Sequence, residues 1–161
     1  MNHYACRYNG FIFITSHRED NNPLTTPGSS VNAVALRLSP GQDLLAALDE
    51  ISEKHELKAA CVLTCVGSLT VAVLRFADWE EPAELTGPFE IVSLTGTLSS
   101  HGSHCHISIS DQQGKTIGGH LLPGCLVYTT AEIVLGVINN QQFLRSYDPK
   151  TGYDELDILS S

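Results

Sequence analysis

The 161-residue sequence lacks the features that define several large classes of protein. Its apolar runs are short: "GFIFI" at residues 10–14 falls far below the roughly 20 residues that a membrane-spanning helix needs. That stretch also lacks the basic flank and the small-residue cleavage site of a secretory signal. A phosphate-binding loop is missing too, because "GKT" at residues 114–116 has neither the upstream glycine nor the following helix. We therefore expect a protein of the cytoplasm, the nucleus or both.

The cysteines do not form the patterns of a disulfide framework or a zinc finger. Their number is odd and no two are spaced as CxxC, which is typical of reduced thiols in an intracellular compartment. Cys61 and Cys65 are spaced to share one face of a strand, where they could hold a metal ion, but small buried core residues are the commoner role of free cysteines. The five are Cys6, Cys61, Cys65, Cys105 and Cys125.

Clusters of lysine and arginine are absent as well. Nine basic residues stand against eighteen acidic ones, and the net charge is −9. Neutralisation of phosphates drives affinity for nucleic acids, so a bare DNA-binding domain normally shows a basic patch. The charge balance argues against direct, unaided binding to DNA.

What the sequence does contain begins with a polar N-terminal stretch. Residues 1–30 are rich in Asn, Pro, Ser, Thr and Gly and predict a flexible leader, with one short strand at residues 11–15. The ordered domain is expected over residues 31–159, opening with a strand at residues 31–38. We find no internal repeat, and the length suits a single domain with its own hydrophobic core.

One helix is predicted after that first strand, over residues 40–55. Ser39 is suited to be its N-cap, and Gln42 three residues later completes a capping box. Apolar residues recur at helical spacing while acidic and basic residues occupy the other side, so the helix is expected to be amphipathic. His55 falls at its C-terminal end and receives no further role. The apolar positions are Leu44, Leu45, Leu48 and Ile51.

The pattern then changes to β-branched and apolar runs punctuated by glycine and turn residues. Strands are expected at residues 59–66, 68–77, 88–100 and 126–138, and Gly67 separates the first two. Turn residues punctuate the C-terminal tail. Strands dominate and one helix covers them, which predicts an α+β fold with a mostly antiparallel sheet and one main amphipathic helix packed on it.

Four of the seven histidines gather in the stretch "HGSHCHISISDQQGKTIGGHLLPG". Its central "DQQG" predicts a hairpin with a three-residue loop ending at Gly114, where the backbone needs positive φ. Asp111 then faces Lys115, an oppositely charged cross-strand pair. The same register places His106 opposite His120. A slip of one residue would send His120 to the other face.

Alternation along the two strands gives the hairpin one polar and one apolar face. His104, His106 and His120 share the polar face, and neighbours so placed have Cβ atoms within about 5.5–8 Å. Three such imidazoles can converge on one ion with bonds of about 2.0–2.1 Å, and zinc, copper, nickel or ferrous iron would suit them. The alternative is polar residues on the wet face of a sheet. His101 lies outside the hairpin and is expected to be solvated.

Five blocks of the sequence resemble the plant and prokaryote conserved (PPC) domain, in order and in spacing, from about residue 31 to residue 159. The blocks are "LRLSPGQDLLAALDEI" (36–51), "VGSLTVAVLR" (66–75), "GPFEIVSLTGTL" (87–98), "HCHISISDQQGKTIGGHL" (104–121) and "TTAEIVLG" (129–136). The resemblance implies the α+β fold already expected and a homotrimer. It also implies a histidine-rich site that can hold zinc, with His104, His106 and His120 at the matching positions.

This chain resembles the stand-alone bacterial and archaeal members more than the plant proteins, which usually lack these histidines. It has no Arg-Gly-Arg-Pro AT-hook, the segment with which the plant proteins reach DNA. It also has Pro88 where the plant block "Gly-Arg-Phe-Glu-Ile" carries arginine. The DNA-binding role of the family therefore transfers poorly.

Three functions follow from these observations. The leading one is a small, non-catalytic, trimeric metal-binding protein. The second is a DNA-associated regulatory module that works as an oligomer or through nuclear protein partners. The third is a metal-dependent hydrolase or lyase, for which no catalytic residue is assigned. Its nearest variant is a cupin-like oxygenase, but the glutamate expected shortly after HxH is absent. Glu90 and Glu132 could assist a metal-bound water, or could pair with Arg37 or Arg75.

Overall fold

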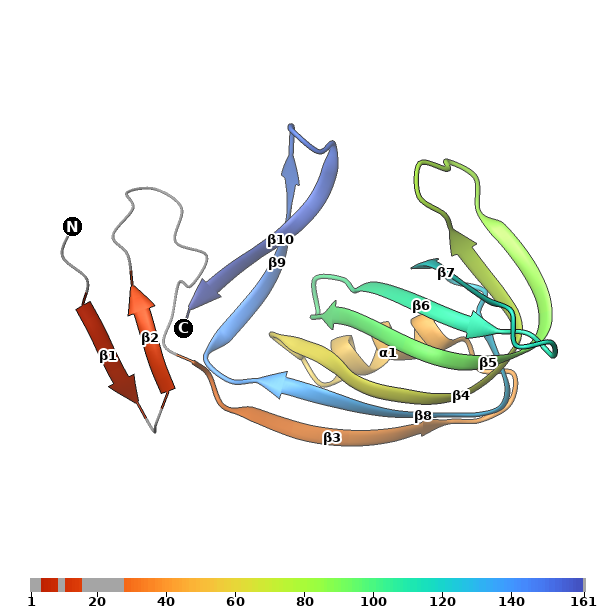
Figure 1. Ribbon diagram of the computed structural model, residues 1–161, viewed down its shortest axis with the longest axis horizontal. Coiled ribbons are helices and arrows are strands. Elements are labelled where there is room, and N and C mark those ends of the chain that lie inside the picture. The colour runs from red at the N-terminus through yellow and green to blue at the C-terminus, as the bar shows by residue number, and fades with distance from the viewer. Residues whose placement is uncertain (1–3, 9–10, 16–27, 161) are drawn as a thin grey trace.

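The computed structural model describes residues 4–8, 11–15 and 28–160 (Figure 1). Most of the predicted leader lies outside this part of the chain, although the strand expected at residues 11–15 is present as β2. The strands are β1 (Tyr4–Tyr8), β2 (Phe11–Thr15), β3 (Val31–Leu38), β4 (Ala60–Arg75), β5 (Ala83–Leu98), β6 (His104–Ser110), β7 (Thr116–Leu121), β8 (Leu126–Ile138), β9 (Gln141–Asp148) and β10 (Tyr153–Ser160), and the helix is α1 (Leu44–Lys54). None of the helices described is long and apolar enough to cross a membrane.

The centre of the molecule is a six-stranded antiparallel sheet in the order β3-β8-β4-β5-β6-β7. The last strand, β7, pairs with β6 on one side and also with the end of β4, where Leu74 faces Leu121 and Arg75 faces His120. Strands β4, β5, β6 and β7 therefore close on themselves. Helix α1 packs against β5 and β8. The predicted mostly antiparallel sheet with one helix is confirmed.

The core lies between α1 and the sheet and continues inside the closed set of strands. Leucine and isoleucine dominate it, because their side chains fill space without polar atoms that would need partners. Its largest fully buried side chains include Leu44, Leu48, Leu69, Leu74, Leu98, Ile109, Leu121, Ile133 and Leu135.

The helix begins four residues later than predicted, and its N-cap is Asp43 rather than Ser39. One carboxylate oxygen of Asp43 accepts hydrogen bonds of 3.0 Å from the N–H groups of Leu45 and Ala46. Residues 39–42 form a tight turn instead, in which Gly41 has φ +80° and cannot continue a right-handed helix. Half of the expected capping box survives, since the Gln42 side chain accepts from the Ser39 N–H at 2.7 Å.

Strand β4 is one long strand where two were predicted. Gly67 lies within it at φ +150°, and a Cβ there would come 2.1 Å from the Thr130 carbonyl oxygen of β8. A register shift against β8 between Val62 and Thr64 also overturns the prediction that Cys61 and Cys65 share a face. They face Gly136 and Ile133 of β8, which are three residues apart and therefore point to opposite sides.

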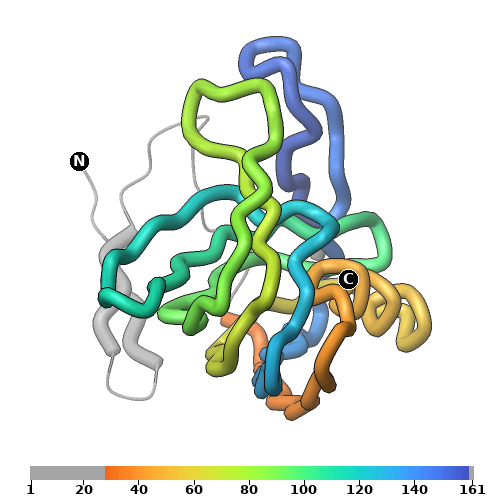
Figure 2. The backbone as a smooth tube through the Cα atoms, turned by 90° about the vertical axis from the view of Figure 1, so that its right-hand side faces the viewer, coloured from red at the N-terminus to blue at the C-terminus, as the bar shows by residue number. Residues whose placement is uncertain are grey.

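Two hairpins project from the same side of the sheet, β4–β5 and β9–β10 (Figures 1 and 2). Strand β5 begins at Ala83, within a segment predicted to be loop, because residues 83–86 pair with the end of β4. The sequence pattern predicts turn residues in the C-terminal tail but not the two strands of the β9–β10 hairpin. Its register joins Tyr153 to Asp148 across a turn in which Gly152 has φ +79°.

Candidate metal centre

The histidine hairpin has the predicted register. In β6 and β7, His106 faces His120, Ile107 faces Gly119 and Ile109 faces Ile117. The loop closes as expected, with Gly114 at φ +79° and the Asp111 N–H donating to the Lys115 carbonyl at 3.0 Å. The side opposite the histidines packs into the core through Cys105, Ile107, Ile109 and Leu121.

The three predicted residues lie together on the other side. The Nε2 atoms of His104 and His106 are 3.2 Å apart, and one ligand nitrogen from each of the three rings lies within 4.8 Å of the others. Two nitrogen ligands of a tetrahedral zinc ion would be about 3.3 Å apart for bonds of about 2.05 Å. The His104–His106 spacing already matches, and His120 offers a third nitrogen within 4.8 Å of the other two.

Burial and nearby positive charge favour the neutral form of two of these imidazoles, His104 and His120. Burial lowers the pKa of His120 to about 4, and the neighbouring His104 and Arg75 act in the same direction. The pKa of His104 is also lowered, first by burial and then by the charges of His106 and Arg145. Neutral imidazole is the form that binds a metal ion, so His104 and His120 need not lose a proton to do so at pH 7.

One ring nitrogen carries a further signal. Nδ1 of His120 is buried, and none of the residues that the structure describes gives it a hydrogen-bond partner. A buried polar atom without a partner costs free energy, and an ion is one of the groups that accounts for such an atom in a native protein. The donor set and this orphaned nitrogen both fit a divalent transition metal.

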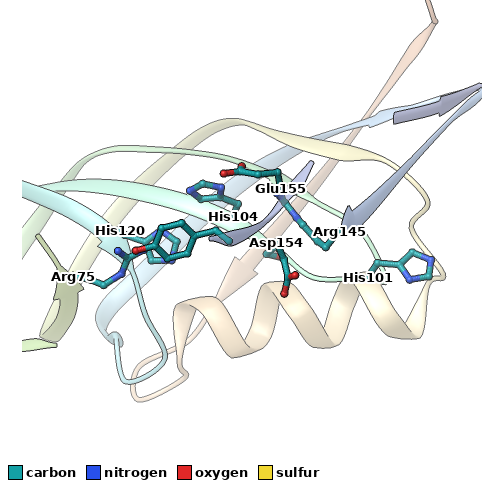
Figure 3. A pocket seen from close by; sticks show the side chains of 9 residues that line it. Arg75, His101, His104, His120, Arg145, Asp154 and Glu155 are labelled. Atoms are coloured by element: carbon teal, nitrogen blue, oxygen red, sulfur yellow. The ribbon is translucent and has the colours of Figure 1, made fainter. Parts of the chain in front are cut away.

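Two of the hollows beside the histidines are lined by both His104 and His120, and Figure 3 shows the first of them. The first has a volume of about 400 Å³ and is also lined by Ser103 and by residues of β9 and β10. The second is about 530 Å³ and reaches Phe76, Ala77 and Gly118. Arg75, His104 and His120 line both. The remaining side chains at the first hollow are His101, Arg145, Tyr153, Asp154 and Glu155.

The other candidates from the sequence lie apart from this group. His101 is exposed in the turn after β5 and points away from the imidazoles, although it borders the first hollow (Figure 3). Glu90 and Glu132 line neither hollow. Glu132 faces Arg37 across β3 and β8, but Arg37 donates to the Thr130 hydroxyl at 2.9 Å. His55 is the C-cap of α1.

Sequence reasoning did not identify the two arginines of the site. Arg75 carried a usable signal, because it is a lone charge at the end of an otherwise apolar strand. Arg145 carried none, because nothing local shows that its strand returns beside β5, where its guanidinium donates to the Thr97 hydroxyl at 2.9 Å.

Comparison with known proteins confirms the resemblance to the PPC domain. The model of this family, also named the Plants and Prokaryotes Conserved (PCC) domain, matches residues 25–139. The bifunctional protein GlmU of Synechococcus sp. (strain JA-3-3Ab) is 48% identical over 136 residues, which cover 84% of this chain but only 22% of that protein. The chain thus spans a small part of the length of this relative.

Two solved structures match this chain over nearly all of their own length. A hypothetical protein from Salmonella enterica is 43% identical, with a TM-score of 0.81, and the match covers 83% of this chain and 97% of that one. A metal-containing protein from Archaeoglobus fulgidus is 26% identical, with a TM-score of 0.72, over 83% of this chain and 99% of that one.

Proposed function

The chain belongs to the Plants and Prokaryotes Conserved (PCC) domain family, and on that premise we propose that it is a small metal-binding protein whose His104, His106 and His120 hold a zinc ion. The observation that carries the proposal is the convergence of the three imidazoles from two paired strands. The metal-containing relative from Archaeoglobus fulgidus supports it.

The protein's own contribution is the placement of three imidazole ligands. Strand β6 carries two of them two residues apart, and the register with β7 supplies the third on the same face. Because the strand register already brings the three backbone positions together, the chain need not be reorganised to bind an ion. Zinc held by three protein nitrogens keeps a position for water or another ligand, where it acts as a Lewis acid.

We also propose that the chain assembles as a homotrimer, as the resemblance to its family implies. Support comes from the outward face of the sheet, where Val31, Leu63 and Val66 of β3 and β4 are exposed by 50%, 52% and 55%. Exposed apolar residues grouped on one face of a sheet are typical of an interface between protein chains.

Direct binding to DNA gains no support from charge. The net charge of −9 opposes approach to a polyanion, and the arginines of the site share their hollow with Asp154 and Glu155.

Metal analysis of protein purified without a histidine tag tests the zinc proposal. We expect about one zinc per chain in the wild type and loss of that zinc in the double variant His104→Ala/His106→Ala, because one imidazole cannot retain the ion alone. His55→Ala is the matched control, since His55 is exposed at the helix end and should leave the zinc content unchanged. Equal zinc in the wild type and the double variant would refute the proposal.

A further inference from the structure

Arg75 is a half-buried cation for which the described residues provide no hydrogen bond and no carboxylate partner. Within the described part of the chain, its guanidinium lies over the face of the Tyr153 ring, with 5.7 Å from the guanidinium carbon to the ring centroid. A partly desolvated charge is normally paired, because removing it from water without a counter-charge is costly. An aromatic ring offsets only part of that cost. The guanidinium therefore has unused capacity for an anion.

Arg75 lies next to the three histidines, so an anion bound to its guanidinium would lie next to them too. Arg75 faces His120 across β4 and β7, and it borders both hollows together with His104 and His120. The pairing depends on close contact of the two strands, since a Cβ on Gly119 would come 2.8 Å from the Arg75 carbonyl oxygen. The strand pairing thus fixes the Arg75 backbone directly beside that of His120.

A second guanidinium approaches from another strand. Arg145 of β9 uses one nitrogen to bond Thr97, the residue that faces His104 across β5 and β6. A guanidinium has five N–H donors, so several stay available, and Arg145 lines the first hollow. Figure 3 shows Arg75 and Arg145 on either side of the imidazoles.

The remaining lining residues limit what the hollow can accept. Its volume of about 400 Å³ is at the small end of the range of about 300–1,000 Å³ for small-molecule sites. Asp154 and Glu155 of β10 border the same space. Their carboxylates would repel a long polyanion but would accept hydrogen bonds from hydroxyl or amino groups at the far end of a small ligand.

From these observations we infer that the hollow binds a small organic anion, and that Arg75 holds its carboxylate or phosphate group next to the metal ion. This inference rests on the proposed metal site and adds the chemical class of ligand. Arginine suits the task because its planar fork binds carboxylate and phosphate oxygens in pairs. Arg145 contributes positive charge from the opposite side.

The test uses untagged protein loaded with cobalt(II), whose visible spectrum changes when a ligand reaches the ion. Acetate, inorganic phosphate and the neutral acetamide are titrated separately. We expect the two anions to change the spectrum and acetamide to have little effect. Tighter binding of acetate would indicate carboxylate ligands, and tighter binding of phosphate would indicate phosphate esters.

Arg75→Met is the decisive variant, because it keeps most of the side chain's volume and removes its charge. We expect the dissociation constant for the anion to rise about 10- to 100-fold, as loss of a hydrogen-bonded charge partner does. Arg75→Lys should show an intermediate value and guards against a folding defect. Arg37→Met is the matched control, since Arg37 lies on β3 outside both hollows and should bind like the wild type.

Cobalt content separates the two proposals. Normal cobalt content with the same anion affinity in Arg75→Met and the wild type would overturn the anion site and leave the metal site standing. Failure of the wild type to take up cobalt would overturn the metal site. In that case, calorimetric titration of phosphate and acetate into the metal-free protein would test the anion site by itself. The absence of binding heat would overturn the anion site as well.

Discussion

The fold lowers the chemical reactivity of some cysteine side chains much more than that of others. Burial raises the pKa of Cys65 and Cys125 to about 11 and that of Cys105 to about 12. Cys61 is only partly buried, because the bulge in β4 turns it to the outward face. A protonated thiol is a poor nucleophile, so three of these four cysteines should be chemically quiet in the folded protein.

Alkylation with iodoacetamide at pH 8 checks this in a Cys6→Ser background. We expect Cys61 to react fastest, and the other three to react at least about 100-fold more slowly than an ordinary thiol, because a pKa two units higher leaves about 100-fold less thiolate. All four should react at similar rates in urea. Rapid modification of Cys65, Cys105 or Cys125 in the native protein, confirmed by peptide mapping, would contradict the assignment.

The same shifts predict how stability depends on pH. The folded chain keeps protons on three thiols that the unfolded chain releases above about pH 9. The free energy of unfolding should therefore fall as pH rises from about 9 to 11, and these thiols should have little effect below pH 8. Urea denaturation at pH 8 and pH 10 measures this, and a smaller fall in Cys105→Ala than in the wild type would identify the source.

At the scale of elements, the start of α1 links the helix to the loop between β7 and β8. The Asp43 carboxylate caps the helix with one oxygen and accepts from the Gly124 N–H with the other. The adjacent Leu44 N–H donates to the Cys125 carbonyl at 2.8 Å. A single side chain thus fixes both the helix terminus and the chain that leaves the histidine hairpin.

Asp43→Ala should therefore destabilise the protein by about 2 kcal/mol, the upper end of the range for an N-cap, because it also leaves the Gly124 N–H without its hydrogen-bond acceptor. Ser39→Ala is the matched control. Ser39 has the residue type of a cap but lies in the preceding turn, so its replacement should change the free energy of unfolding by less than about 0.5 kcal/mol. Chemical denaturation of the two variants distinguishes them, and equal losses would favour the cap predicted from the sequence.

At the scale of the whole molecule, the two faces of the sheet differ in what covers them. Ile133 and Leu135 of β8 point inward and are buried. On the outward side Val31 and Leu63 lie over Gly136, where an added Cβ would meet them at 2.8 and 3.2 Å. Within a single chain this apolar surface stays exposed, which is the physical basis for proposing self-association.

Leu63→Lys should shift the proposed trimer toward monomer, because assembly would then bury a charge. Trp79→Lys is the control; Trp79 is 60% exposed but lies at the tip of the β4–β5 hairpin, away from this face. Sedimentation equilibrium should give three chain masses for the wild type and the control and a lower mass for Leu63→Lys. An unchanged mass would exclude this face as the interface.

How much could be predicted from the sequence depended on the range of the interactions. The histidine hairpin was predictable in register and facing, because turn chemistry at Gly114 and alternation of polar and apolar residues are local constraints. The strand boundaries of β3 and β8 were predictable for the same reason. The helix start was not, because two capping residues lie four positions apart, and the contacts of Asp43 with a distant loop favoured the later one.

The sequence by itself determined that three imidazoles share one side of a two-stranded hairpin whose other side is apolar. Only the tertiary structure decided what surrounds them. Arg75 reaches the histidines because β7 pairs with the end of β4, and Arg145 because β9 returns beside β5. Pairings between segments far apart in the chain depend on how the sheet closes, and no local pattern of residues encodes that closure.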